Sequence, residues 1–396
     1  MTREVWITGI GAMTAAGDGC AALGALLAEG RSAVRPDDAL GGRAAGRCGP
    51  PVRDRASRRL DRGAALFRAA CLEAWHGAGL VEAPGSAGVG LIEGSSLGPM
   101  CGVLNDYARL IDDPRQRARP SRLIRFMTGA GGALFAQEMG IRGPVFHISA
   151  GSVSATCAIG EAFERVESGK LYLAVAGGSE APLHPGIVAT FEAAGVLSPP
   201  GGAAEPCRPF DVARNGTVLG EGAAALVIES AAHARARGAE PLARILGYGF
   251  CAEAHDLTAP DPEGRGVADS IRGALGTMSP ARLGWVKAHG TGTRLSDAAE
   301  LRALSRLLGP ALATLPVTSL KPALGHCLGA SGAVEAAAAV LALRESFVPV
   351  TLGHRDRDPD LPECLVPRSP LRHAGPALLL SESFGGRCAA LVLAAA

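Results

Sequence analysis

Short apolar segments bounded by glycine, serine or proline recur along the chain and alternate with longer helical stretches. Segments this short, several with β-branched residues, favour buried strands over helices. In the first part of the chain the expected strands are Val5–Ile10, Val89–Ile92, Val145–Ile148, Leu171–Val175 and Ala224–Ile228. The expected helices there are Ala64–Gly77 and Ser154–Ser168. Strands that alternate with helices predict a layered α/β fold.

The second part of the chain repeats this arrangement. Its expected strands are Leu242–Gly249, Gly284–Ala288, Leu315–Ser319, Ala377–Ser381 and Ala389–Leu393. An alanine-rich helix is expected over Ser331–Arg344. The pattern predicts two similar halves, residues 1–240 and 241–396, related by duplication.

Composition narrows the class of protein. With 396 residues, 47% of them hydrophobic and 19% charged, the chain can bury a large core and is not disordered. A net charge of +1 is too small to attract the protein to nucleic acid or to an anionic membrane by overall electrostatics. The longest apolar run, near Ala333–Leu343, is too short to span a bilayer. Ten scattered cysteines form no C-x-x-C pair, so no metal site is expected, and the chain begins without a secretory signal. A reduced, cytoplasmic protein is the prediction.

One candidate nucleophile lies in the segment GPVFHISAGSVSATCAIG, residues 143–160. An apolar strand runs there into a small-residue turn, and a helix follows. A side chain at such a turn stands clear of the backbone, and the helix dipole favours negative charge beside it. Ser152 occupies this turn. The alternative is that Ser152 only caps the helix, with Ser149 and Ser154 as rival caps.

Two further segments carry candidate acid–base groups. In VKAHGTGTRLSDAAE, His289 ends a buried strand and Thr291 and Thr293 follow within a glycine turn. In TSLKPALGHCLGASGAVE, Lys321 and His326 precede a helix that carries Glu335, which could pair with Lys321 in a buried site. The alternatives are structural histidines and an exposed lysine.

Order and spacing of these motifs resemble the β-ketoacyl-acyl-carrier-protein synthases (ketosynthases) of the elongating type, within the thiolase-like superfamily. The resemblance covers nearly the whole chain and implies a five-layer α-β-α-β-α fold built from two duplicated halves. The segments that carry it are VWITGIGAMTAAG, GPVFHISAGS, LAVAGGSEAPLHP, CRPFDVARNGTVLGEGAAALVIE, KAHGTGTRLSDAAE, TSLKPALGHCLGASGAVEA and SESFGG.

The resemblance also implies residue roles. Ser152 falls at the position of the family's nucleophilic cysteine, and His289 and His326 match the two histidines that stabilise the enolate or carbonyl. Lys321 matches the family lysine and Glu335 the acidic residue that orders it. Thr258, Thr291 and Thr293 are expected to bind the phosphopantetheine arm of an acyl carrier protein. No bound cofactor is expected, because the substrates travel on that arm.

Two departures from the family pattern bear on activity. The nucleophile is a hydroxyl, which needs an adjacent base at neutral pH, and an oxygen ester is a weaker acyl donor than a thioester. The family's C-terminal Ser-Phe-Gly-Phe-Gly-Gly-Thr-Asn is shortened here to SFGGRC, residues 383–388. The lost phenylalanine normally supplies an oxyanion N–H, and Gly385 or Gly386 is the expected replacement.

Two functional hypotheses follow from the resemblance. The first is an acyl-processing enzyme of fatty-acid or type II polyketide biosynthesis that performs condensation, acyl transfer or malonyl decarboxylation. The second is an impaired subunit similar to the chain-length factors that pair with an active ketosynthase. The retained histidines favour the enzyme, whereas the lost cysteine and shortened loop favour the subunit.

The resemblance implies partners as well. An acyl carrier protein and either a homodimer or a heterodimer with a second ketosynthase are expected. Carrier proteins are acidic, so basic residues near the cavity mouth would attract them. The candidates are Arg58, Arg59, Arg62 and Arg115. The alternative is a solvated helix face, and nucleic-acid binding is not expected because no aromatic residues interleave with these clusters.

Overall fold

The computed structural model describes residues 3–50, 54–81, 87–112, 120, 122–200, 205–372 and 375–396. Its N-terminal half contains the strands β1 (Val5–Thr14), β2 (Gly17–Asp18), β5 (Val89–Gly94), β6 (Val145–Ile148), β7 (Leu173–Glu180) and β8 (Gly222–Ser230). They lie in the order β6-β5-β7-β8-β1, with β2 folded back on β1. The pairs β1–β8 and β8–β7 are antiparallel, whereas β7–β5 and β5–β6 are parallel.

The C-terminal half repeats this topology. Its strands are β9 (Ala243–Ala252), β10 (Trp285–Lys287), β11 (Val317–Thr318), β14 (Ala377–Ser383) and β15 (Arg387–Ala395). Their order, β9-β15-β14-β10-β11, has two antiparallel pairs followed by two parallel pairs, as in the first half. Antiparallel pairing of β1 with β9 joins the halves into one sheet. The repeated topology is the structural counterpart of the predicted duplication.

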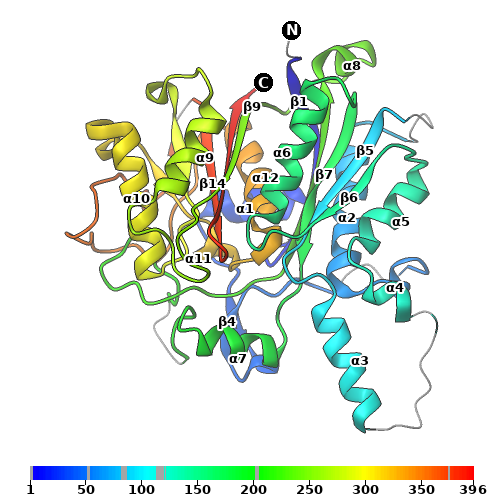
Figure 1. Ribbon diagram of the computed structural model, residues 1–396, viewed down its shortest axis with the longest axis horizontal. Helices are drawn as coiled ribbons and strands as arrows, with labels where there is room; N and C mark the ends of the chain where they lie inside the picture. Colours follow the sequence, from blue (N-terminus) through cyan, green and yellow to red (C-terminus); the bar gives the residue numbers. More distant parts are fainter. Residues whose placement is uncertain are drawn as a thin grey trace.

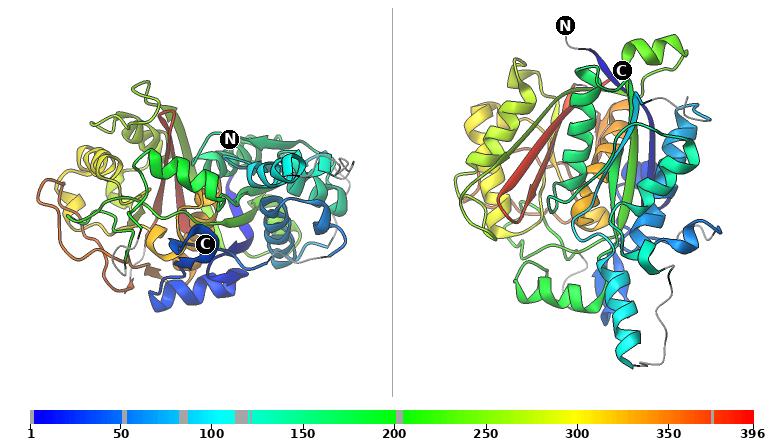
Figure 2. Two further views of the ribbon diagram at one scale, coloured as in Figure 1. Left: turned by 90° about the horizontal axis from the view of Figure 1, so that it is seen from below. Right: turned by 45° about the vertical axis from the view of Figure 1, so that its right-hand side comes forward.

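Five layers result from the way helices cover this sheet. The central layer is formed by α6 (Ser154–Glu167) and α12 (Ser331–Arg344), which contact each other and strands of both halves. One outer layer contains α2 (Arg62–Gly77) and α5 (Ala130–Met139), and the other contains α9 (Arg265–Leu275) and α10 (Arg294–Leu308). Figures 1 and 2 show the central helices between the two halves of the sheet. Each interface between layers encloses an apolar cluster.

The remaining elements connect or flank these layers. The helices are α1 (Cys20–Glu29), α3 (Met100–Asp112), α4 (Arg122–Phe126), α7 (Pro185–Ala193), α8 (Ala231–Ala236) and α11 (Lys321–Leu324). Two small hairpins are formed by β3 (Arg35–Asp37) with β4 (Arg43–Ala45), and by β12 (Phe347–Val348) with β13 (Leu371–Arg372). Within the described ranges, no helix is long and apolar enough to cross a membrane.

The predicted strands are all present, with one difference in burial. The segment Val145–Ile148 was expected to be buried, but β6 is the edge strand of the sheet and pairs only with β5 among the described residues. Val145 and Phe146 are therefore 40% and 43% exposed. Apolar composition alone does not distinguish a central strand from an edge strand that a partner covers.

Candidate active site

Ser152 lies at the turn between β6 and α6 and lines a cavity. Gly151 has φ 67°, a conformation that glycine adopts without strain, and a Cβ there would lie 1.9 Å from Ser383 Oγ. The N-cap residue of α6 is Val153, and no side chain caps this helix end. The capping hypothesis for Ser152 is therefore wrong, because its hydroxyl faces another group instead.

That group is His326. Ser152 Oγ lies 3.2 Å from His326 Nε2, and His326 Nδ1 lies 2.9 Å from Ser331 Oγ at the start of α12. Burial, followed by the nearby Lys321 charge, lowers the pKa of His326 well below its usual 6.5. The imidazole is thus neutral at pH 7. It can accept the Ser152 proton if Nδ1 carries the hydrogen, or donate from Nε2 if Ser331 donates to Nδ1.

His289 follows β10 and is held by Lys321. The Lys321 ammonium lies 3.4 Å from His289 Nδ1 and also donates to the His289 carbonyl oxygen. Because an ammonium group can only donate, Nδ1 accepts and the ring proton lies on Nε2. Burial, then the Lys321 charge, lowers the pKa of His289 well below 6.5. A neutral imidazole with a defined N–H donor results.

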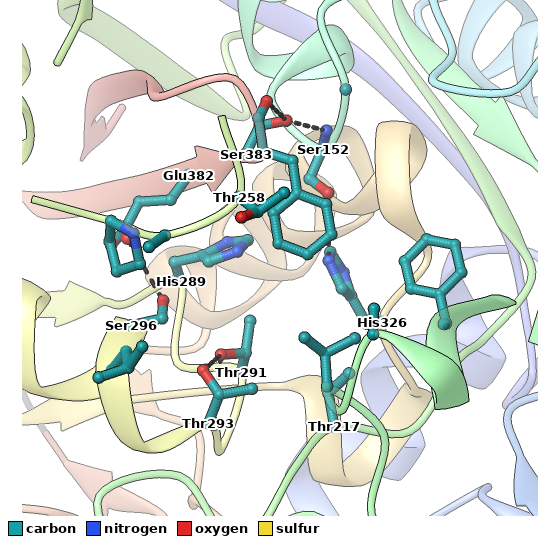
Figure 3. Close-up of a pocket in the computed structure, with 18 of the residues that line it drawn as sticks. Ser152, Thr217, Thr258, His289, Thr291, Thr293, Ser296, His326, Glu382 and Ser383 are labelled. Atoms are coloured by element: carbon teal, nitrogen blue, oxygen red, sulfur yellow. Dashed lines mark hydrogen bonds between the residues drawn. The ribbon is translucent and has the colours of Figure 1, made fainter. Parts of the chain in front are cut away.

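The two imidazoles share one cavity. Their ring centroids are 5.3 Å apart and the rings are nearly perpendicular. Figure 3 shows both rings directed into the space beside Ser152. The cavity has a volume of about 680 Å³ and is also lined by Thr258, Thr291 and Thr293. The structure therefore brings together the serine, both histidines and all three threonines that the sequence suggested.

Glu335 holds two buried lysines rather than one. It accepts hydrogen bonds from Lys321 at 3.0 Å and from Lys287, whose ammonium also donates to the Leu380 carbonyl at 2.7 Å. Both lysine side chains are 1% exposed. Lys287 was missed in the sequence, although a lysine within the apolar strand WVKA was a signal for a buried charge with a partner.

Glu300 of α10 fixes the backbone at His289 and at the residue that follows it. Its carboxylate accepts the N–H groups of His289 and Gly290, the latter at 2.9 Å. Burial raises the pKa of Glu300. This carboxyl, which the sequence did not single out, determines where the His289 ring stands in the cavity.

Glu382 is a second carboxyl that the structure adds to the cavity wall. It is 7% exposed, and Ser296 donates to its Oε2 at 3.3 Å, while Oε1 has no partner among the described residues. Burial, then the nearby Glu300 charge, raises its pKa well above the usual 4.5. Burial therefore favours the uncharged form of Glu382 in this wall of the cavity.

Comparison with known proteins identifies the chain. Family models for the Beta-ketoacyl synthase N-terminal and C-terminal domains match residues 2–234 and 242–355. The chain belongs to the β-ketoacyl synthase family. The five-layer arrangement is the thiolase-like fold of that family, as the resemblance implied.

Similar proteins match nearly the whole chain. A protein named polyketide beta-ketoacyl synthase 1 from Streptomyces cyaneus is 35% identical, over 99% of this chain and 98% of its own. Nodulation protein E of Rhizobium meliloti (strain 1021) is 34% identical, over 93% of each chain. A chain from the complex of a type II PKS acyl-carrier protein with its ketosynthase bound to the hexaketide is 26% identical with a TM-score of 0.91, covering 100% of both chains. A beta-ketoacyl synthase from Burkholderia phymatum STM815 is 28% identical with a TM-score of 0.87, also over 100% of both chains.

The N–H groups that were expected to bind an oxyanion are arranged differently from the sequence expectation. The Ser152 N–H donates to Ser383 Oγ at 3.0 Å, and the Gly385 N–H donates to the Leu257 carbonyl at 2.6 Å. The proposal that Gly385 supplies an oxyanion donor is therefore wrong in this conformation. Gly386 lines the cavity, and its carbonyl accepts the Glu253 N–H at 2.7 Å. An incoming oxyanion must displace the Ser383 hydroxyl to reach Ser152.

The arginines expected to bind a carrier protein separate into three cases. Arg58 and Arg59 are exposed on the short 3-10 helix Ser57–Arg59. Arg62 instead points inward, where its guanidinium donates to Glu221 at 2.7 and 3.0 Å and to the Cys48 carbonyl at 2.7 Å. It is therefore a structural residue and not a docking residue. Arg115 lies outside the described residues.

Thr258, Thr291 and Thr293 keep hydroxyls on the cavity wall but bond locally. Thr291 and Thr293 oxygens are 2.9 Å apart, and the Thr258 hydroxyl donates to Asp256 at 3.1 Å. Each hydroxyl retains at least one further donor or acceptor site for a ligand. Their shared position is what a bound pantetheine arm would require.

Proposed function

We propose that the chain decarboxylates malonyl groups carried on the phosphopantetheine arm of an acyl carrier protein. One observation carries the proposal: two neutral imidazoles face one cavity, while the N–H of the nucleophile position is already bonded to Ser383. Decarboxylation needs donors for an enolate oxygen, and it does not need a covalent acyl-enzyme. The part of the site that serves decarboxylation is thus complete, and the part that serves acyl transfer is impaired.

In the proposed reaction the bond between C2 and the carboxylate of the malonyl thioester breaks. Its electron pair moves toward the thioester carbonyl oxygen, and carbon dioxide leaves. The His289 Nε2–H, fixed by Lys321, donates to the developing enolate oxygen, and His326 supplies a second donor when Ser331 donates to its Nδ1. C2 then takes up a proton from water, which gives an acetyl thioester.

Acylation of Ser152 competes for the same imidazole. His326 must carry its hydrogen on Nδ1 to accept the serine proton, and in that state Nε2 cannot donate to an enolate. A serine ester is also less activated toward carbanion attack than a thioester. Condensation is therefore proposed to be slow compared with decarboxylation.

The test of the proposal uses malonyl-loaded acyl carrier protein and intact mass spectrometry. Acetyl carrier protein should accumulate with the wild-type chain and with Ser152→Ala, because the hydroxyl takes no part in the loss of carbon dioxide. An acyl adduct on the wild-type chain that disappears in Ser152→Ala would assign the chemistry to acyl transfer instead. If neither acetyl carrier protein nor an acyl adduct forms, the proposal that the chain is an enzyme is wrong.

A chain-length-factor-like role is the second candidate. The Ser152 N–H that is bonded to Ser383, together with the exposed edge strand β6, is consistent with a subunit that pairs with an active ketosynthase. Solved relatives include the ishigamide ketosynthase/chain length factor, 29% identical with a TM-score of 0.88. Loss of decarboxylation in the isolated chain, combined with stable assembly onto a cysteine-bearing ketosynthase, would favour this role.

The decarboxylation rate is expected to stay constant as the pH falls from about 8 to about 6. Burial lowers the pKa of His289 and His326 well below 6.5, so both imidazoles remain neutral across this interval. The measurement is kcat against pH with malonyl carrier protein. A decrease centred near the ordinary histidine pKa would show that an imidazole is protonated there, contrary to the buried geometry.

Ser152→Cys is expected to restore acylation, and adding Ser383→Ala should increase its rate a further twofold to tenfold. The estimate converts the roughly 0.5–1.5 kcal/mol net value of one hydrogen bond, because the oxyanion no longer displaces the Ser383 hydroxyl. Acyl transfer from a labelled acyl carrier protein measures the rate. An equal rate in Ser152→Cys with and without Ser383→Ala would show that the Ser383 hydroxyl does not obstruct the oxyanion position.

Charge reversal at Arg58 and Arg59 is expected to weaken carrier-protein binding about twofold to tenfold at low salt, and less at high salt. Both side chains are exposed, so the change affects long-range attraction rather than folding. Calorimetry with the acidic carrier protein gives the affinity. A matched reversal at Arg272 and Arg282, exposed on the opposite outer layer, should leave it unchanged. Equal affinity in all variants would remove Arg58 and Arg59 from the docking surface.

A further inference from the structure

Two cysteines lie directly opposite each other on neighbouring strands. Cys251 of β9 and Cys388 of β15 are register partners in an antiparallel pair, so their side chains project from the same face of the sheet. Both sulfurs lie against Gly266 of α9. Cys251 Sγ donates to the Gly266 carbonyl at 2.9 Å, and Cys388 Sγ is 3.2 Å from the place a Cβ on Gly266 would occupy. The two thiols therefore meet over a residue that has no side chain to separate them.

The separation of these cysteines fits a disulfide. The Glu253 N–H donates to the Gly386 carbonyl at 2.7 Å, which marks those residues as a hydrogen-bonded pair. Hydrogen-bonded and non-bonded pairs alternate along an antiparallel ladder, so Cys251 and Cys388, two positions along, form a hydrogen-bonded pair as well. The Cα atoms of such pairs are about 5.5 Å apart, within the ~4.4–6.8 Å that disulfides span.

Their electrostatic environment distinguishes them from the other cysteines. A hydrogen bond from the Cys388 thiol lowers the pKa of Cys251, which is half-buried and reachable from solvent. The pKa of each of the other nine cysteines is raised. Burial is the main cause for eight of them, and the hydrogen bond to Cys251 is the main cause for Cys388. Thiolates, not thiols, react with peroxides.

We propose that Cys251 and Cys388 are a modification site, a dithiol that hydrogen peroxide converts to a disulfide in the wall of the active-site cavity. The Cys251 thiolate attacks the peroxide, which breaks the O–O bond, forms a sulfenic acid and releases water after proton uptake. The Cys388 thiol then attacks that sulfur, forming the S–S bond and releasing a second water. Overall two thiols lose two electrons and two protons to one peroxide.

Oxidation of this pair would change the cavity wall, because Cys388 is part of that wall. Cys388 and Glu253 both line the cavity, and Cys388 Sγ lies 3.5 Å from Glu253 Oε1. Glu253 also accepts the Asp261 N–H at 3.0 Å, so it anchors both ends of the loop that carries Thr258. Cys388 has a single thiol hydrogen, which it can donate either to Cys251 or to this carboxylate, and a disulfide removes it. The site stands on its own geometry and does not depend on malonyl decarboxylation.

The chain offers an internal control in Cys48 and Cys327. Their sulfurs lie 3.2 and 3.3 Å from the same Glu221 carbonyl oxygen, so this pair is also close in space. Both residues are buried, 4% and 2% exposed, and burial raises the pKa of each thiol. Proximity without an accessible thiolate should leave this pair reduced.

The test treats the full-length protein with hydrogen peroxide, alkylates the remaining thiols and maps the peptides by mass spectrometry. A crosslink between Cys251 and Cys388, with a mass lower by two hydrogens and reversed by dithiothreitol, is the expected result. Cys388→Ser should stop at a sulfenic acid on Cys251, Cys251→Ser should abolish the reaction, and Cys48→Ser should behave as the wild type.

Several outcomes would overturn the proposal. These are a crosslink that joins Cys48 to Cys327, overoxidation of Cys251 without any crosslink, or no oxidation of Cys251 at all. Peptide mapping of the wild-type chain gives this answer even if a serine variant fails to fold.

Discussion

Replacing His289 with alanine is expected to reduce malonyl decarboxylation about 100- to 1000-fold, with a smaller change in KM. The ring is held by Lys321 on one nitrogen and by Glu300 through its backbone, so its Nε2–H is aimed before the substrate arrives. A donor fixed in this way needs no reorganisation when charge develops on the enolate oxygen. Removing it eliminates stabilisation that exists mainly in the transition state.

The measurement is the initial rate of carbon dioxide release from malonyl carrier protein. His76→Ala, at the exposed end of α2, is the matched control and should keep the wild-type rate. Lys321→Met should leave the ring in place without its fixed tautomer, so a decrease in kcat smaller than that of His289→Ala is expected. A His289→Ala variant that retains its rate would exclude this imidazole from the chemistry and would leave the chain-length-factor-like role as the better explanation.

The sequence predicted which residues meet, because the architecture that places them follows from local patterns. His289 and Lys321 each follow a short apolar strand, and the parallel pairing of β10 with β11 brings the ends of those two strands together. Ser152 follows β6 at the opposite edge of the sheet, so its approach to His326 was expected from the family resemblance and depends on how the two halves pack. Glycine at position 151 and the helix that begins at Ser154 likewise mark the turn. The conformation of such a turn can therefore be predicted from the residues that form it.

Partners that lie far apart in the chain could not be predicted in the same way. The hydrogen bond from Ser152 N–H to Ser383 joins positions separated by 231 residues, and Arg62 meets Glu221 across 159 residues. Each of these hydrogen bonds depends on how two segments distant in the sequence pack against each other. The local sequences SFGG and RRLDR do not determine that packing. The same holds for the exposure of β6, which depends on being last in the sheet.

Glu335→Ala is expected to lower the free energy of unfolding by about 3–5 kcal/mol, the largest stability effect of any single charge in the site. Glu335 is the shared counter-ion of Lys287 and Lys321, and all three side chains are nearly inaccessible to water. Burial already lowers the pKa of Lys287, so without the carboxylate its charged form becomes still less favourable. The lysines can respond by losing a proton, which limits the cost but does not remove it.

The urea midpoint with its slope measures the change. Glu263→Ala is the matched control, because Glu263 pairs with Arg306 at the surface, where the side chains are 53% and 45% exposed, and its loss should cost no more than ~1 kcal/mol. Glu335→Gln, which keeps hydrogen-bonding oxygen but no charge, should fall between the two. Because Lys321 also fixes the tautomer of His289, Glu335→Ala should slow decarboxylation, by no more than Lys321→Met does, under conditions where it remains folded. Unchanged stability in Glu335→Ala would mean that the lysines are neutral in the folded protein, and the argument that Lys321 determines the proton position on His289 would fail with it.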